Sequence, residues 1–247
     1  MHTHDAVVTF ADVGGYAAVK SRLLHMVKLR QNQTSGGATT SIPLGMNKAS
    51  GVLLHGPSGC GKTMLVEAVA TESRCPFVLV RAPDLLSPYL GESERKLREL
   101  FASVQSAETS VVFLDEVDAI IPARTDYASS GAGGVGERLL STLLNEIDGI
   151  STKGGSFIIG ATSRLDAVDP ALRRPGRLGA LIEIHHPSGS DRVDIADLYS
   201  RKFNIDLDGI DWAQPDFDGS TGADIKKAYE EAAMDRIRES IKGDLGE

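Results

Sequence analysis

The feature that most constrains this chain is a glycine-rich segment at residues 51–63, which reads Gly-Val-Leu-Leu-His-Gly-Pro-Ser-Gly-Cys-Gly-Lys-Thr. An apolar run before the pattern G-x-x-x-x-G-K-[ST] predicts a buried strand, and the residues after it predict a helix. Glycines let the backbone wrap closely around an anion, so successive N–H groups point at phosphate oxygens. The helix places its positive end at the same point. We therefore predict a phosphate site at 56–63.

Two side chains at the end of this segment have the chemistry that a bound phosphate chain needs. Lys62 can reach the outer phosphates, and the hydroxyl of Thr63 can ligate Mg²⁺. The competing interpretation is an ordinary glycine-rich turn that happens to end in Lys-Thr. The predicted strand and helix on either side argue against it.

Four further apolar runs predict buried strands, and helical periodicity separates them. The strands are predicted at the apolar run that leads into the glycine-rich turn and at 77–80, 111–114, 157–161 and 181–184, and the helices at 16–30, 62–73, 93–106 and 137–147. Alternating strands and helices indicate an α/β fold with a parallel sheet covered on both faces. Ligands of such sheets bind at the carboxyl ends of the strands. Polar and glycine-rich composition predicts loops at 31–41 and 125–136.

The strand signals stop after Pro187, where the chain changes character. Helices are predicted at 191–202 and 221–241, and Thr221 with Asp224 forms a possible capping box at the start of the second. We therefore predict two domains, an α/β nucleotide-binding domain at 1–187 and a small helical domain at 188–247.

Composition bounds the compartment and the partners. The formal net charge is −8 and the isoelectric point is about 5.3, which argues against a general nucleic-acid-binding surface. Cys60 and Cys75 are the only cysteines, so a reducing compartment is expected. The apolar runs are too short to span a membrane, and the first residues have no signal-peptide core. These features predict an intracellular protein, cytoplasmic or at an organelle surface.

Two adjacent acids, Asp115 and Glu116, directly follow an apolar strand. Nucleotide hydrolysis needs a carboxylate to hold Mg²⁺ and a second group to orient the attacking water. We predict the first role for Asp115 and the second for Glu116. Acids at a strand end can also be solvated caps of a following helix, and only the phosphate loop elsewhere in the chain favours the catalytic interpretation.

A basic run lies at 173–177, Arg-Arg-Pro-Gly-Arg. Phosphoryl transfer needs positive charge near the γ-phosphate as the transition state forms. A run of charges is more often a solvated surface, and composition alone favours that alternative.

Read together, these motifs resemble the AAA ATPase family, in the branch of valosin-containing protein and its peroxisomal and ribosome-biogenesis relatives. The resemblance runs from Phe10 to Ile241. It is carried by the segments 10–15 (Phe-Ala-Asp-Val-Gly-Gly), 56–63, 111–116, 161–164 (Ala-Thr-Ser-Arg), 173–178 and 221–224. The resemblance implies a P-loop NTPase fold, with a five-stranded parallel sheet flanked by helices and a small C-terminal helical lid.

The resemblance also implies a role for each matching residue. Those expected to bind ATP or ADP are Asp12, Val13, Gly14, Pro57, Ser58, Gly59, Cys60, Gly61, Lys62, Thr63, Met64, Tyr199, Gly222 and Ala223. Thr63 and Asp115 are expected to hold Mg²⁺. The expected catalytic residues are Glu116, Lys62, Ser163 at the first sensor, and Arg174 and Arg177 as arginine fingers that reach a neighbouring subunit's nucleotide.

Fingers that act on a neighbour imply a ring-forming homo- or hetero-oligomer, a hexamer by resemblance. Tyr89, Leu90 and Gly91 resemble the central-pore loop that grips a protein substrate, with 125–136 as a second pore loop. From the sequence alone, Tyr89 could equally pack under its own helix. The implied function is protein remodelling, unfolding or disassembly driven by ATP hydrolysis, with adaptor proteins as further partners.

The match departs from the family pattern at four places. Ser163 stands where asparagine is usual, Leu178-Gly179-Ala180 replaces a charged interface segment, and Tyr199 stands where many relatives carry a histidine. The loop at 31–41 replaces a more regular segment that contains proline. A serine hydroxyl is shorter than an amide and has fewer hydrogen-bonding groups. These departures keep open a weakly hydrolysing or non-hydrolysing regulatory subunit of a mixed ring. A nucleic-acid-loading ATPase is disfavoured by the acidic balance and by Tyr89.

Overall fold

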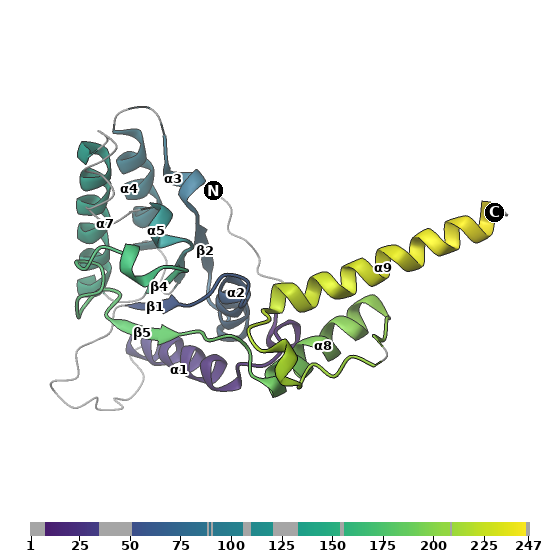
Figure 1. Ribbon diagram of the computed structural model, residues 1–247. Coiled ribbons are helices and arrows are strands. Elements are labelled where there is room, and N and C mark those ends of the chain that lie inside the picture. Colours follow the sequence, from purple (N-terminus) through teal and green to yellow (C-terminus); the bar gives the residue numbers. More distant parts are fainter. Residues whose placement is uncertain are drawn as a thin grey trace.

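Five parallel strands form one sheet in the computed structural model, which describes residues 8–34, 51–87, 89, 91–105, 110–120, 133–153, 156–207 and 209–245. The strands are β1 (Gly51–His55), β2 (Phe77–Val80), β3 (Val111–Leu114), β4 (Phe157–Thr162) and β5 (Ala180–Glu183). Their order is β2-β3-β4-β1-β5, and every neighbouring pair is parallel (Figure 1). The predicted α/β fold with a five-stranded parallel sheet is confirmed.

Helices cover both faces of this sheet. The α-helices are α1 (Ala17–Thr34), α2 (Lys62–Ser73), α3 (Ala82–Leu85), α4 (Glu92–Gln105), α5 (Val117–Ile120), α7 (Gly133–Lys153), α8 (Gly189–Phe203) and α9 (Gly222–Leu245), and 3-10 turns lie at Phe10–Asp12, Leu165–Ala167 and Pro215–Phe217. Helices α4 and α7 pack side by side on one face, and α1 and α2 on the other (Figure 1).

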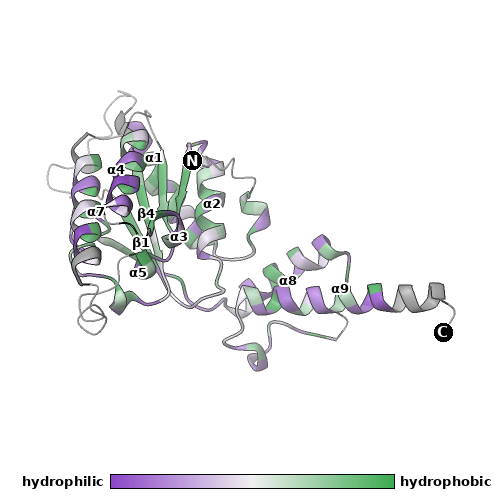
Figure 2. Ribbon diagram, turned by 90° about the horizontal axis from the view of Figure 1, so that it is seen from above, coloured by the Kyte–Doolittle hydropathy of each residue, from purple (hydrophilic) through white to green (hydrophobic). Residues whose placement is uncertain are grey.

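Alternating strand residues fill two separate cores, because successive side chains of a strand point to opposite faces. In β3, Val112 and Leu114 join the core under α4 and α7, whereas Val111 and Phe113 join the core under α1 and α2. All four are at most 1% exposed, which is why the strand reads as a continuous apolar run. Figure 2 shows the strands of the sheet in green, the colour of apolar residues, between helices that carry both green and purple.

A third core lies among the C-terminal helices, outside the two cores of the sheet. It is built from α8, α9 and the segment between them and contains Ile195, Ala196, Tyr199, Trp212, Ile225 and Tyr229. Helix α9 begins beside the turn that follows β1 and runs away from the sheet (Figure 1). No helix in the described part of the chain is both long and apolar enough to cross a membrane.

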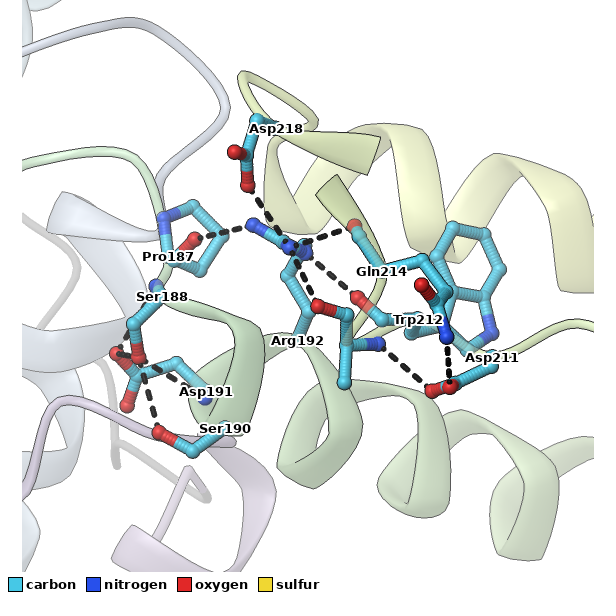
Figure 3. A network of polar contacts seen from close by, with 10 residues as sticks. Pro187, Ser188, Ser190, Asp191, Arg192, Asp211, Trp212, Gln214 and Asp218 are labelled. Atoms are coloured by element: carbon cyan, nitrogen blue, oxygen red, sulfur yellow. Dashed lines mark hydrogen bonds and ion pairs between the residues drawn. The ribbon is translucent and has the colours of Figure 1, made fainter. Parts of the chain in front are cut away.

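A buried arginine organises the start of this C-terminal part (Figure 3). Arg192 is 2% exposed. Its guanidinium donates to the carbonyls of Pro187 (3.2 Å), Trp212 (2.7 Å) and Gln214 (3.1 Å) and pairs with Asp218 at 3.0 Å. One side chain thereby ties the end of the sheet region to the segment that precedes α9.

The helix boundaries correct several sequence predictions. Residues 31–34 continue α1, although a loop was predicted there, and 133–136 belong to α7 and not to a loop. In both cases the helix extends past its predicted boundary into residues of low propensity, which are Asn32 and Thr34 in α1 and Gly133, Gly134 and Gly136 in α7. The short helices α3 and α5 were not predicted, because four residues are too few for periodicity to appear. The predicted loop residues 35–41 and 125–132 lie outside the described residues.

Candidate nucleotide-binding and catalytic site

A pocket of about 320 Å³ lies at the carboxyl ends of the strands, against the first residues of α9. That volume falls in the usual range of small-molecule sites. Most of the predicted site residues line it, namely Asp12, Val13, Gly14, Ser58, Gly59, Cys60, Gly61, Lys62, Thr63, Met64, Asp115, Glu116, Ser163, Tyr199, Gly222 and Ala223. The structure therefore brings segments from the whole length of the chain to one cavity.

The glycine-rich turn is fastened to the start of α9. The N–H of Ala223 donates to the carbonyl of Gly59 at 3.1 Å. Gly59 has φ +80°, and a Cβ placed there would come within 2.8 Å of the hydroxyl of Thr221. Only glycine allows both this backbone conformation and this close approach. The predicted capping box is present, since Asp224 accepts from the N–H and hydroxyl of Thr221, both at 2.8 Å.

The segment that contains Asp12, Val13 and Gly14 packs closely against α8. A Cβ on Gly14 would lie 2.6 Å from the Cα of Ile195. The N–H of Tyr16 donates to the carboxylate of Asp191 at 2.9 Å. Burial by itself raises the pKa of Asp191, but hydrogen bonds from Ser188 and Tyr16 outweigh it and hold that pKa below its ordinary value. Helix α8 thus forms one wall of the pocket.

Lys62 lies at the first position of α2, and its ammonium points back toward the glycine-rich turn. Its Nζ donates to the carbonyls of Gly56 at 2.7 Å and Pro57 at 2.8 Å. Burial lowers the pKa of Lys62, and the nearby carboxylates of Asp115 and Glu116 act in the opposite direction. An ammonium has three donors, so one N–H remains for a ligand in this position. Pro57 itself does not line the pocket.

Thr63 and Asp115 meet at the pocket. The hydroxyl of Thr63 donates to Oδ2 of Asp115 at 3.0 Å. Mg²⁺ prefers hard oxygen ligands and is usually held by one or two protein groups together with phosphates and water. A hydroxyl and a carboxylate side by side fit that requirement.

Glu116 lines the same pocket with an exposed side chain. Its φ is +53°, in the left-handed region that residues other than glycine rarely adopt. Such conformations persist where the surrounding structure enforces them, and they are frequent at functional sites. Here the first turn of α5 holds the carbonyl of Glu116 through the N–H groups of Ala119 and Ile120.

Besides Pro57, the two predicted arginine fingers and Tyr89 do not line the pocket. The guanidinium of Arg177 is paired with Asp148 of α7 through two hydrogen bonds, 2.8 and 2.7 Å, and also donates to the carbonyl of Ala171. Arg174 is exposed, and its guanidinium makes no hydrogen bond or ion pair with the residues that the structure describes. Tyr89 is 74% exposed, so it does not pack under its own helix.

The remaining residues of the predicted pore loops are only partly described. Gly91 precedes α4 with φ +79°, where a glycine is needed. Leu90 and 121–132 lie outside the described residues.

Sequence reasoning missed several residues of the pocket wall, which are Tyr16, Ala161, Thr162, Ile195, Leu198 and Lys226. The apolar period of α8 contains Ile195, Leu198 and Tyr199 and could have indicated a common face. Lys226 follows Gly222 by about one helical turn, so helix geometry places both on the same side. Nothing in the local sequence of Tyr16 indicates its contact with α8.

Comparison with known proteins bears on this arrangement directly. The family model described as "ATPase family associated with various cellular activities (AAA)" matches residues 52–186, more than half of the chain. The chain belongs to the AAA ATPase family. The matched region is a single AAA module, and its phosphate loop, acidic pair and first-sensor strand are the parts that line the pocket.

Individual AAA relatives match nearly the whole chain. It is 37% identical over 236 residues to the ATPase family gene 2 protein of Saccharomyces cerevisiae and 39% identical over 232 residues to protein CdcH of Halobacterium salinarum, covering 95% and 94% of this chain. An uncharacterised AAA domain-containing protein of Schizosaccharomyces pombe is 38% identical over 82% of the chain. The chain spans only 29%, 30% and 26% of the lengths of these relatives.

Proposed function

We propose that this AAA module hydrolyses ATP with Mg²⁺ and that the hydrolysis drives remodelling, unfolding or disassembly of protein substrates. The observation that carries the proposal is the meeting of Lys62, Thr63, Asp115, Glu116 and Ser163 in one pocket. This set supplies the binding and orienting groups that phosphoryl transfer needs.

Each residue of the set has a distinct task in the proposed reaction. The N–H groups of 58–63 and the ammonium of Lys62 bind the phosphates, and Thr63 with Asp115 would hold the metal. When bound there, the metal would supply positive charge that offsets the negative charge developing on the phosphates. Glu116 orients the attacking water and accepts its proton, and the hydroxyl of Ser163 donates toward the γ-phosphate or that water.

None of the arginines that the structure describes lines the pocket, and this includes Arg174 and Arg177. We propose that both act on the nucleotide of a neighbouring copy. A head-to-tail contact of this kind closes into a ring, for which six subunits are proposed. Exposed Tyr89 would contact a protein substrate, delivered by an adaptor, in the pore of that ring, and no role in nucleic-acid binding is proposed.

The C-terminal part, residues 188–247, is proposed to be a separate lid domain. Its own core supports this division. Its contacts with the glycine-rich turn and with the segment at Gly14 support the role of a lid on the pocket. Nucleotide release would then change how α8 and α9 sit against the sheet, and this movement would be passed to the neighbouring subunit.

Two substitutions test the hydrolytic assignment. Lys62→Ala should abolish tight ATP binding, and Glu116→Gln should keep binding while turnover falls by about 10²–10⁴-fold. The matched controls are Lys227→Ala and Glu231→Gln, since both side chains are exposed on α9 and neither lines the pocket. Undiminished turnover in either test variant would contradict the assignment. Nucleotide binding without turnover in the unaltered protein would favour the regulatory-subunit alternative.

A further inference from the structure

Asp118 lies on α5, two residues after Glu116, and its carboxylate bonds to the end of the neighbouring strand. The side chain is 10% exposed. Its Oδ1 accepts from the hydroxyl of Thr162 at 2.7 Å, and its Oδ2 accepts from Nε and Nη2 of Arg164, both at 3.3 Å. A buried carboxylate with such partners is held in one orientation.

The two partners of Asp118 stand on either side of Ser163. Thr162 is 1% exposed, and its hydroxyl also accepts from the N–H of Arg164 at 3.0 Å. The backbone before and after Ser163 is thereby fixed. The side chain of Ser163 is exposed at the pocket and makes no hydrogen bond with any described residue.

The same short helix also holds Glu116. The N–H groups of Ala119 and Ile120 donate to the carbonyl of Glu116 at 2.8 and 3.2 Å, and Glu116 keeps its unusual φ of +53°. Strands β3 and β4, which lead to Glu116 and Ser163, are neighbours in the sheet. Helix α5 therefore connects the two ends from which both side chains enter the pocket.

We propose that Asp118 is a positioning residue that sets the hydroxyl of Ser163 against the carboxylate of Glu116. The inference rests on the proposed ATP hydrolysis. A serine hydroxyl is short and rotates freely, so its reach depends on where its backbone lies. A displacement of about 1 Å in a catalytic group costs about 10²-fold in rate, which is the size of effect that an anchor such as Asp118 can have.

The central test is Asp118→Asn, which keeps the shape and removes the charge that holds Arg164. Turnover should fall about 10- to 100-fold, while the Kd for ADP changes less than about twofold. Thr162→Val and Arg164→Ala should each give part of this loss. The matched control is Asp166→Asn, since Asp166 is exposed, lies just beyond Arg164 and does not line the pocket.

Coupling to Ser163 separates positioning from mere structural support. Ser163→Ala should slow turnover by itself, and adding Asp118→Asn to that variant should have little further effect because the positioned group is already gone. A full additional loss in the double variant would overturn the proposal. So would unchanged turnover in Asp118→Asn, or a loss of ADP binding that parallels a fall in the thermal midpoint.

A binding measurement keeps the inference independent of turnover. Asp118→Asn should weaken binding of ATPγS relative to ADP, because only ATPγS has a γ-phosphate for Ser163 to contact, whereas Asp166→Asn should leave the ratio unchanged. An unchanged ratio in Asp118→Asn would overturn the inference. A changed ratio in a protein that shows no turnover would instead refute the proposed hydrolysis and leave the role of Asp118 standing.

Discussion

The nucleotide pocket and the arginine segment 173–177 differ in how the chain completes them. At the pocket, residues from the N-terminal segment, the ends of three strands (β1, β3 and β4), α8 and α9 meet around one cavity. In the arginine segment, Arg174 is exposed, and Arg177 is paired with Asp148 of the same chain. The pocket gathers its binding groups within a single copy, whereas Arg174 presents a charged side chain that has no partner among the described residues.

Side chains that meet within one chain identify the residues that act at that chain's own site. Such contacts give no information about residues that act at the site of a neighbouring copy. Parallel strands bring their carboxyl ends to one edge of the sheet, so motifs far apart in sequence meet without any partner. A residue that serves a neighbour has no reason to approach its own pocket. Substitutions in the nucleotide pocket and in the arginine segment test this difference.

The largest effect is expected for Arg174, which is proposed to act on the nucleotide of a neighbouring copy. Arg174→Ala should lower turnover about 10³-fold, as loss of an arginine finger does, without changing ADP affinity or thermal stability, because Arg174 has no partner among the described residues. Turnover is measured at high protein concentration, where oligomers form. Arg201→Ala on α8 is the control. Full activity in Arg174→Ala would remove the trans role and leave the pocket self-sufficient.

A second effect is expected where the pocket depends on close packing. Gly14→Val places atoms against the backbone of Ile195, 2.6 Å from the Cβ position. Because the backbone of a packed helix cannot give way cheaply, we expect nucleotide affinity to fall more than tenfold and the thermal midpoint to drop by several degrees. Ala11→Val, at an exposed neighbouring position, is the control. Unchanged nucleotide affinity in Gly14→Val would show that α8 is not a wall of the functional site.

Several features of the pocket could be predicted from sequence because they are local. The phosphate loop, the acidic pair at 115–116 and the capping box at Thr221 each depend on a few adjacent residues whose chemistry has one main use. What could not be predicted depends on long-range contacts. Tyr16 against Asp191 and Asp118 against Thr162 join residues 175 and 44 positions apart, and no short pattern encodes such a contact.

The limits of local patterns also explain the errors in the helix boundaries. Asn32, Thr34 and the glycines near 133 have low helix propensity, yet α1 and α7 include them. In the added turn of α1, the side-chain amide of Gln31 donates to the carbonyl of Ser73 and to Sγ of Cys75 on a distant segment, both at 2.9 Å. Contacts of this kind decide where a helix ends, and the sequence pattern does not contain them.

A smaller effect is expected on the pH dependence of stability, through Asp191 of α8 at the wall of the pocket. The pKa of Asp191 is lowered in the folded state, so its stabilising contribution is complete above the unfolded value of about 3.9 and is lost as the pH falls through the folded value. Asp191→Asn should therefore reduce the loss of thermal stability between pH 5 and pH 3. The measurement is the thermal midpoint at each pH, and an unchanged slope would contradict the assignment.

The smallest effect is expected for the pair that holds Arg177. A double-mutant cycle on Arg177→Ala and Asp148→Ala should give a coupling free energy of about 0.5–1 kcal/mol, because the Asp148 side chain is 49% exposed and solvent weakens the pair. Chemical denaturation measures it. A coupling near zero would mean that Arg177 is as free as Arg174 to reach a neighbour.

The hydrolytic site is proposed to be completed by another copy of the chain. Complementation between two inactive variants tests this most directly. Glu116→Gln retains the arginines and lacks the water-orienting group, and Arg174→Ala is the reverse. In a mixed assembly, the arginine of one variant can serve the intact pocket of the other. We predict turnover in the mixture well above the sum of the separate variants, rising with protein concentration. Turnover equal to that sum at every ratio, from variants shown to assemble together, would contradict the claim.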